Sequence, residues 1–88
     1  MSEQAFTIGE KVFIRTVTYH LTGKVVAIKG NFLVLGEAAW IADDGRFTQC
    51  IDEGKVAEVE PVKCLVRVNM DSIVDAYEWN HDLPREQI

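Results

Sequence analysis

The chain contains five segments in which apolar and β-branched residues follow one another in the short runs typical of strands. They cover residues 11–19, 24–28, a long run that begins at residue 32, residues 63–70 and residues 73–79. The fourth segment alternates most regularly, with Cys64, Val66, Val68 and Met70 on one face and Lys63, Leu65, Arg67 and Asn69 on the other. Residues 20–23 break the first segment from the second. The pattern predicts an all-β protein.

Gly30 and Asn31 form a two-residue turn signal between the second and third segments. A glycine at the first position supplies the positive φ of a type II′ turn, which predicts a tight antiparallel hairpin. The expected pairs are Ile28 with Leu33, Ala27 with Val34, and Val26 with Leu35. Gly36 lies inside the third run, where a strand glycine is typical of a bulge or a sharp bend.

The period of the pattern changes after the third run. Phe47, Cys50 and Ile51 stand at positions i, i+3 and i+4, which predicts a helix of two to three turns within residues 43–55. Asp43 or Asp44 is suited to cap its start, and Gly54 to close its end. The following residues 56–61 are expected to form a polar linker.

The run from Phe32 to Leu35 is apolar at every position, so both faces of this strand are expected to be buried. Five short strands with tight connections favour a small, strongly bent antiparallel sheet closed as a barrel, with the helix inserted between strands three and four. The inside of such a barrel is too small for every apolar residue. We therefore expect one face of residues 28–42 to line the barrel and the other to meet a second copy of the chain. Residues 1–83 are predicted to form this single domain, and residues 84–88 a flexible tail.

Composition narrows the class of protein. The chain has 88 residues and a net charge of −5, which argues against a nucleic-acid binder that works by bulk positive charge. The first ten residues lack the apolar core of a signal peptide, so we expect Cys50 and Cys64 to be free thiols in a cytoplasmic, non-secreted protein. No apolar run approaches the length of a membrane-spanning helix, so no membrane partner is expected.

Residues that carry chemistry are few. His20 and His81 have no ligand or base partner at motif spacing, and we expect both to be surface loop histidines. The two cysteines lack the paired spacing of a zinc site, and no nucleophile or phosphate-loop motif is present. We expect the carboxylates of residues 43–44 and 52–53 to cap and solvate the helix. The sequence predicts no catalytic residues, no metal site, no cofactor and no enzymatic activity.

Two parts of the chain resemble the motifs of the Sm and Sm-like proteins. A broken first strand followed by Gly23-x-Val25 and by residues 28–35 is similar to the first motif, in which a glycine opens the second strand and an Asn begins the third. Residues 66–74, VRVNMDSIV, are similar to the second motif, in which an Arg lies in a short turn between strands four and five. Lys29 stands where the family usually has an Asp, and Val68 where it has a glycine. The loop between strands two and three is also shorter.

The resemblance implies an assembly and a ligand. Sm-like proteins form rings in which the fourth strand of one copy pairs with the fifth strand of the next, which implies a cyclic homo-oligomer of about five to seven copies. The interface residues would be Val66, Val68, Val74 and Tyr77. The family binds single-stranded nucleic acid, usually RNA, on the rim of the ring.

Four residues are candidates for contacts with that nucleic acid: Lys29, Asn31, Arg67 and Asn69. The charged groups of Lys29 and Arg67 would bind phosphates, and the amides of Asn31 and Asn69 would bind base edges. Phe32 would stack on a base. Lys29 and Arg67 also have alternative roles. Lys29 is also typical of a solvated hairpin tip, and Arg67 of a cross-strand ion pair with Asp75 or Glu78.

Three further segments resemble a family of uncharacterised small proteins of tailed phages, especially cyanophages: residues 38–47, 58–61 and 72–84. This resemblance implies an Sm-like fold and a site of action inside an infected host cell, with no assigned activity. It leaves two functions open. The chain is expected to bind single-stranded RNA or DNA as a ring, or to serve as a non-enzymatic phage assembly module that binds protein.

Overall fold

The structure of the protein is a computed structural model that describes residues 6–43 and 45–86. Within these residues, no helix is long and apolar enough to cross a lipid bilayer. The elements in chain order are β1 (Lys11–Thr16), β2 (His20–Lys29), β3 (Phe32–Asp43), α1 (Phe47–Glu53), β4 (Glu58–Pro61), β5 (Val66–Asn69), the 3₁₀ turn η1 (Met70–Ser72) and β6 (Ile73–Glu78).

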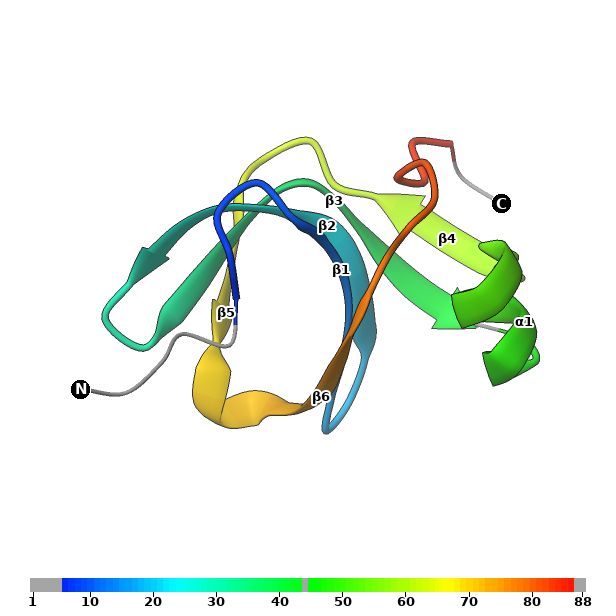
Figure 1. Cartoon of the computed structure of the whole chain (residues 1–88), viewed down its shortest axis with the longest axis horizontal. Coiled ribbons are helices and arrows are strands. Elements are labelled where there is room, and N and C mark those ends of the chain that lie inside the picture. Colours follow the sequence, from blue (N-terminus) through cyan, green and yellow to red (C-terminus); the bar gives the residue numbers. More distant parts are fainter. Residues whose placement is uncertain (1–5, 44, 87–88) are drawn as a thin grey trace.

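The strands form one strongly curved antiparallel sheet in the order β4-β3-β2-β1-β6 (Figure 1). Strand β3 is 12 residues long, and its free edge is shared: β5 pairs with its first half and β4 with its second half. The turn η1 joins β5 to β6. Within the described part of the chain, no ladder pairs β6 with β5 or β4, so the sheet is not closed. The prediction of an all-β protein with one short helix is confirmed.

Several predicted boundaries were wrong. The first strand ends at Thr16, and the second begins at His20 because residues 20–23 pair with β1 instead of breaking the sheet. Residues 58–61 were expected to lie in a linker but form strand β4. This strand has only one buried residue, Val59, between exposed glutamates, so its pattern carries little signal. Strand β5 begins at Val66, which leaves Cys64 exposed before it; no disulfide joins Cys64 to the buried Cys50.

The hairpin between β2 and β3 was predicted with the correct turn. Gly30 has a positive φ of 57°, and Ile28 pairs with Leu33 as expected. Ala27 also pairs with Val34 as expected. The third predicted pair is wrong, because Leu35 lies opposite Val25. Val26 is an extra residue in β2, and such a bulge shifts the pairing of every later position by one.

A second irregularity in the same ladder lies directly after Gly36. Lys24 pairs with Gly36 and Thr22 with Ala39, so two residues of β3 lie opposite Gly23 alone. One of them, Glu37, has a φ of 49°, the left-handed conformation that such bulges use. The bend predicted at Gly36 is therefore present one residue later.

This bulge lets the two halves of β3 bury opposite faces, whereas Phe32, before it, stays 45% exposed and not buried as expected. Before it, Leu33 and Leu35 face a first core, whose buried members are Val12, Ile14, Leu21, Val25, Leu33, Leu35, Ala38 and Val68. After it, Ala39 and Ile41 face a second core on the other side of the sheet, with Phe13, Cys50, Val59 and Trp79. Helix α1 and the segment after β6 thus cover the second half of β3. Ala39 and Ile41 are therefore buried within the chain itself, without a second copy.

Helix α1 packs on the sheet by the predicted stripe. Cys50 is fully buried, and Phe47 and Ile51 are partly buried against the second core. Gly54 ends the helix with a φ of 75°, as expected, and its N–H donates to the carbonyl of Cys50. The start differs from the prediction, because the N-cap residue is Arg46, without a side-chain cap. Asp43 ends β3 instead, and Asp44 lies outside the described residues.

Arg15 links β1, β6 and α1. Its guanidinium pairs with Asp75, directly opposite on β6, through an Nε–Oδ1 hydrogen bond of 2.6 Å. It also lies 5.0 Å from the centroid of the Phe47 ring. The hydrogen bonds from Arg15 lower the pKa of Asp75 below its usual value. Asp75 is therefore engaged by Arg15, and the ion pair considered between Asp75 and Arg67 does not form.

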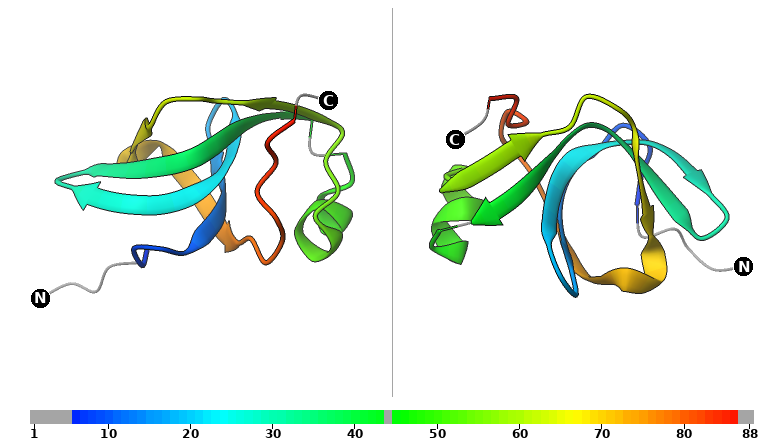
Figure 2. Two further views of the ribbon diagram at one scale, coloured as in Figure 1. Left: turned by 90° about the horizontal axis from the view of Figure 1, so that it is seen from above. Right: turned by 180° about the vertical axis from the view of Figure 1, so that it is seen from behind.

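The segment after β6 runs back towards β4 (Figure 2). The carbonyl of His81 accepts a hydrogen bond of 2.6 Å from Lys11 Nζ, and its ring Nε2 lies 2.8 Å from the carbonyl of Ile51. Arg85 donates a hydrogen bond of 2.9 Å to the carbonyl of Ala38. The expectation of surface loop histidines was wrong, because His81 is partly buried against α1 and His20 against Phe13. Residues 87–88 of the predicted flexible tail lie outside the described residues.

We expect Gly36→Val to lower the free energy of unfolding by about 1–3 kcal/mol, the range for an overpacked site. Gly36 is buried, and a Cβ placed on it would lie 3.1 Å from Val26 Cγ1 and 3.6 Å from Leu65 Cδ2. The larger side chain must therefore displace residues on both neighbouring segments. Urea denaturation followed by circular dichroism measures the cost. An unchanged midpoint would show that Val26 and Leu65 move aside freely.

Candidate nucleic-acid interface

The turn between β2 and β3 lies beside the turn that follows β5. Asn31 Nδ2 donates a hydrogen bond of 2.8 Å to Asn69 Oδ1, although the two residues are 38 positions apart. The backbone N–H of Met70 donates to the carbonyl of Asn31 at 2.8 Å. Two of the four residues proposed from the sequence are thus in direct contact.

Asn69 mainly holds this junction together. Its side-chain oxygen also accepts a hydrogen bond of 2.9 Å from the N–H of Asp71, which caps the start of η1. Its backbone carbonyl accepts a further bond of 2.7 Å from Ser72 Oγ. The side-chain oxygen of Asn69 thus accepts hydrogen bonds from both Asn31 and Asp71. It is therefore less suited to contact a base edge than expected from the sequence.

Lys29 and Arg67 lie on the same outward face of the sheet. Residues directly opposite one another in antiparallel strands share a face. The register places Lys29, Phe32 and Asn69 in one row across β2, β3 and β5, and Ala27, Val34 and Arg67 in the next. Lys29, Phe32 and Arg67 are exposed, and Phe32 keeps 45% of its surface accessible.

A groove of about 320 Å³ runs between these side chains. It is lined by Val26, Ala27, Lys29, Val34, Leu65 and Arg67, and we call it the β2–β3–β5 groove. Its floor is apolar, its two charges are both positive, and no carboxylate is among its lining residues within the described part of the chain. Neither Lys29 nor Arg67 forms an ion pair with another described residue. Residues Val26 and Leu65 were not singled out from the sequence, because a bulge and an irregular loop bring them here.

The residues proposed for an oligomer interface occupy different environments. Val74 is 63% exposed, whereas Val68 is 1% exposed and belongs to the first core. Val66 packs partly against the first core and Tyr77 partly against the second. The outer edges of β5 and β6 each lack a neighbouring strand among the described residues. Of the four side chains, Val74 is exposed, whereas Val68 is buried and not accessible to another copy.

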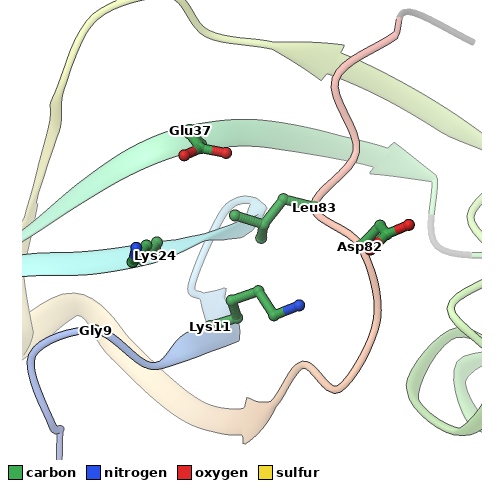
Figure 3. Close-up of a pocket in the computed structure, with 6 residues that line it drawn as sticks. All are labelled: Gly9, Lys11, Lys24, Glu37, Asp82 and Leu83. Atoms are coloured by element: carbon green, nitrogen blue, oxygen red, sulfur yellow. The ribbon is translucent and has the colours of Figure 1, made fainter.

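A second pocket, of about 450 Å³, lies where the segment after β6 passes β1 and β2 (Figure 3). It is lined by Gly9, Lys11, Lys24, Glu37, Asp82 and Leu83. Its charged side chains are of both signs, unlike those of the β2–β3–β5 groove. Among the described residues, no three His, Cys, Asp or Glu side chains gather as metal ligands would.

Comparisons of this chain with protein-family models, curated proteins and solved structures gave no match. The resemblances drawn from short motifs therefore rest on the sequence alone.

Proposed function

We propose that this protein binds single-stranded nucleic acid, RNA in the first place, through the β2–β3–β5 groove. One observation carries the proposal: Lys29 and Arg67, from the two strands that flank β3, line one apolar groove in which no described carboxylate takes part. In a chain with a net charge of −5, such a local excess of positive charge has to be produced by the fold.

The groove and the exposed Phe32 on the same face together have the two components that single strands require. The ammonium of Lys29 and the guanidinium of Arg67 bind backbone phosphates, which releases counterions. Phe32, exposed on the same face, supplies a stacking surface worth about 1–3 kcal/mol for each base. Phosphate contacts and stacking do not distinguish one base from another, so we expect weak preference for the nucleotide sequence.

Because two cations per chain give little affinity, we further propose that several copies of this curved sheet assemble into an Sm-like ring. Repeating the groove around a ring raises the effective concentration of sites along one strand. The outer edges of β5 and β6, which no other described strand pairs, and the exposed Val74 support such an assembly, because free strand edges favour strand addition.

We expect the purified protein to form a closed cyclic homo-oligomer of about five to seven copies, since edge pairing around an axis closes a ring. Light scattering coupled to size-exclusion chromatography measures the mass. Lys55→Glu, on an exposed side chain away from β5 and β6, should leave that mass unchanged. A stable monomer at micromolar concentration would contradict the ring.

We expect the double variant Lys29→Ala with Arg67→Ala to bind single-stranded RNA roughly tenfold more weakly than the parent at moderate salt. The slope of log K against log salt should flatten by about 1.4 for each protomer in contact, because two phosphate contacts are lost. Fluorescence anisotropy with labelled oligouridine, across a salt series, measures both quantities.

The matched control is Arg46→Ala with Lys55→Ala, which removes the same two charges from exposed positions outside the groove. It should bind as the parent does. If both double variants weaken binding equally, the contact is not at the groove. If the parent binds neither RNA nor DNA at any salt concentration, the protein-binding assembly module replaces this proposal.

A further inference from the structure

The face of the sheet that carries the first core continues beyond that core onto β3 and β4. After the bulge at residues 37–38, Ala38 and Trp40 lie on this face, since they are two positions apart in one strand. Trp40 is directly opposite Leu21, a buried member of the first core. Leu21 and Ala38 are fully buried, whereas Trp40 is 47% exposed. The apolar face therefore runs from the core into solvent at Trp40.

The exposed tryptophan is held by a second aromatic ring. Tyr19 stacks on Trp40 with ring centroids 5.1 Å apart and an angle of 18° between the planes. Tyr19 is itself packed partly against the first core, which fixes the position of the pair. Tyr19 covers one face of the Trp40 ring, and 47% of the surface of Trp40 stays exposed. The face of a tryptophan is the best aromatic surface for a cation.

Two carboxylates lie beside this stack. Glu60 is directly opposite Trp40 in the β3–β4 ladder, so the two side chains share a face. Glu58, two positions earlier in β4, lies on the same face. Both glutamates are exposed, and neither forms an ion pair with another described residue. Aromatic faces and unneutralised carboxylates together complement a positively charged side chain.

The position of β4 determines what kind of cation fits. This strand pairs with β3 on one side and ends the sheet on the other, within the described residues. Its outer edge therefore presents unpaired backbone groups that an extended peptide satisfies by strand addition. A residue added opposite Glu60 lies two strand spacings, about 10 Å, from Trp40. A long arginine or lysine side chain covers most of that distance along the sheet surface.

We propose that the free edge of β4 binds an extended basic peptide segment of a partner protein. Backbone pairing to β4 gives the segment its register. An arginine or lysine side chain then lies over Trp40 between the carboxylates of Glu58 and Glu60. The site is on a different surface from the β2–β3–β5 groove and has the opposite charge, so it does not depend on the proposed binding of nucleic acid.

The test uses the full chain and a synthetic peptide of alternating arginine and threonine residues, with binding measured by isothermal titration calorimetry. We expect the parent to bind this peptide, and Glu58→Gln with Glu60→Gln to bind it about tenfold more weakly. Trp40→Ala should also lose about tenfold, and Trp40→Phe should retain most of the affinity. The control, Asp71→Asn with Glu78→Gln, removes two exposed carboxylates elsewhere and should bind as the parent does.

Three further ligands test whether binding requires both backbone pairing and the cationic side chains. The same peptide with N-methylated alternate amides cannot pair with an edge strand, and a version with glutamate in place of arginine lacks the cations. Both are expected not to bind. Free arginine amide should bind far more weakly than the peptide. The proposal is overturned if the parent fails to bind the basic peptide, or if any of these ligands binds equally well.

One further variant distinguishes peptide binding at β4 from RNA binding at the β2–β3–β5 groove. Lys29→Ala with Arg67→Ala should bind the basic peptide as the parent does, whatever its effect on RNA. Loss of peptide binding in this variant would overturn the assignment to β4. Failure of RNA binding with retained peptide binding would contradict only the proposed function.

Discussion

Replacing Trp79 with alanine is expected to lower the free energy of unfolding by about 4 kcal/mol. Trp79 is 1% exposed and is the largest fully buried side chain among the described residues. Its ring stacks on Phe13 at 5.8 Å and meets His81 edge-on at 4.9 Å. Its indole N–H donates to the carbonyl of Asp82 at 3.1 Å. Alanine would leave a large cavity in the second core and release the segment after β6.

A loss of this size approaches the whole stability of a small domain, which is typically about 5–15 kcal/mol. Urea denaturation followed by far-ultraviolet circular dichroism measures the change. The matched control is Trp40→Ala, since Trp40 is the other tryptophan and is 47% exposed. We expect the control to cost about 1–2 kcal/mol, in proportion to the smaller area that it uncovers. Equal costs for the two variants would contradict the second core as described.

The variant Gly54→Ala is expected to lower the free energy of unfolding by about 3 kcal/mol, through two separate effects. The backbone of Gly54 has a φ of 75°, which costs an alanine about 1–2 kcal/mol. The added Cβ would also lie 2.7 Å from His81 Cγ and 3.0 Å from His81 Cβ, so the ring or helix must move. Overpacking of this kind costs about 1–3 kcal/mol.

The control variant Gly30→Ala separates the cost of backbone strain from the cost of the clash with His81. Gly30 has a φ of 57°, and no atom lies within 4 Å of a Cβ placed on it. The control therefore carries the backbone strain without the steric clash, and we expect it to cost about 1 kcal/mol. Adding His81→Ala to Gly54→Ala should recover part of the loss. If Gly54→Ala costs no more than Gly30→Ala in the same denaturation experiment, His81 does not pack against the end of α1.

Features that depend on residues adjacent in the sequence could be predicted from the sequence alone. The positive φ of Gly30 and the first two pairs of the hairpin follow from a glycine at a tight turn between two apolar runs. The alternation of residues 66–69 correctly separates the inward Val68 from the outward Arg67. The spacing of Phe47, Cys50 and Ile51 and the glycine at position 54 define α1 and its end.

Only the tertiary structure decided which surfaces these elements share. The bulge after Gly36 exchanges the faces of β3, so Ala39 and Ile41 lie in the second core with Cys50 of α1 and Trp79. The glycine at position 36 indicates a bend locally, but the two-to-one pairing that exchanges the faces depends on the partner strand. Strand β4 has one buried residue and exists because β3 is long enough to pair with it. The β2–β3–β5 groove likewise forms from segments far apart in the chain, which meet only when long-range strand pairing brings Lys29 and Arg67 together.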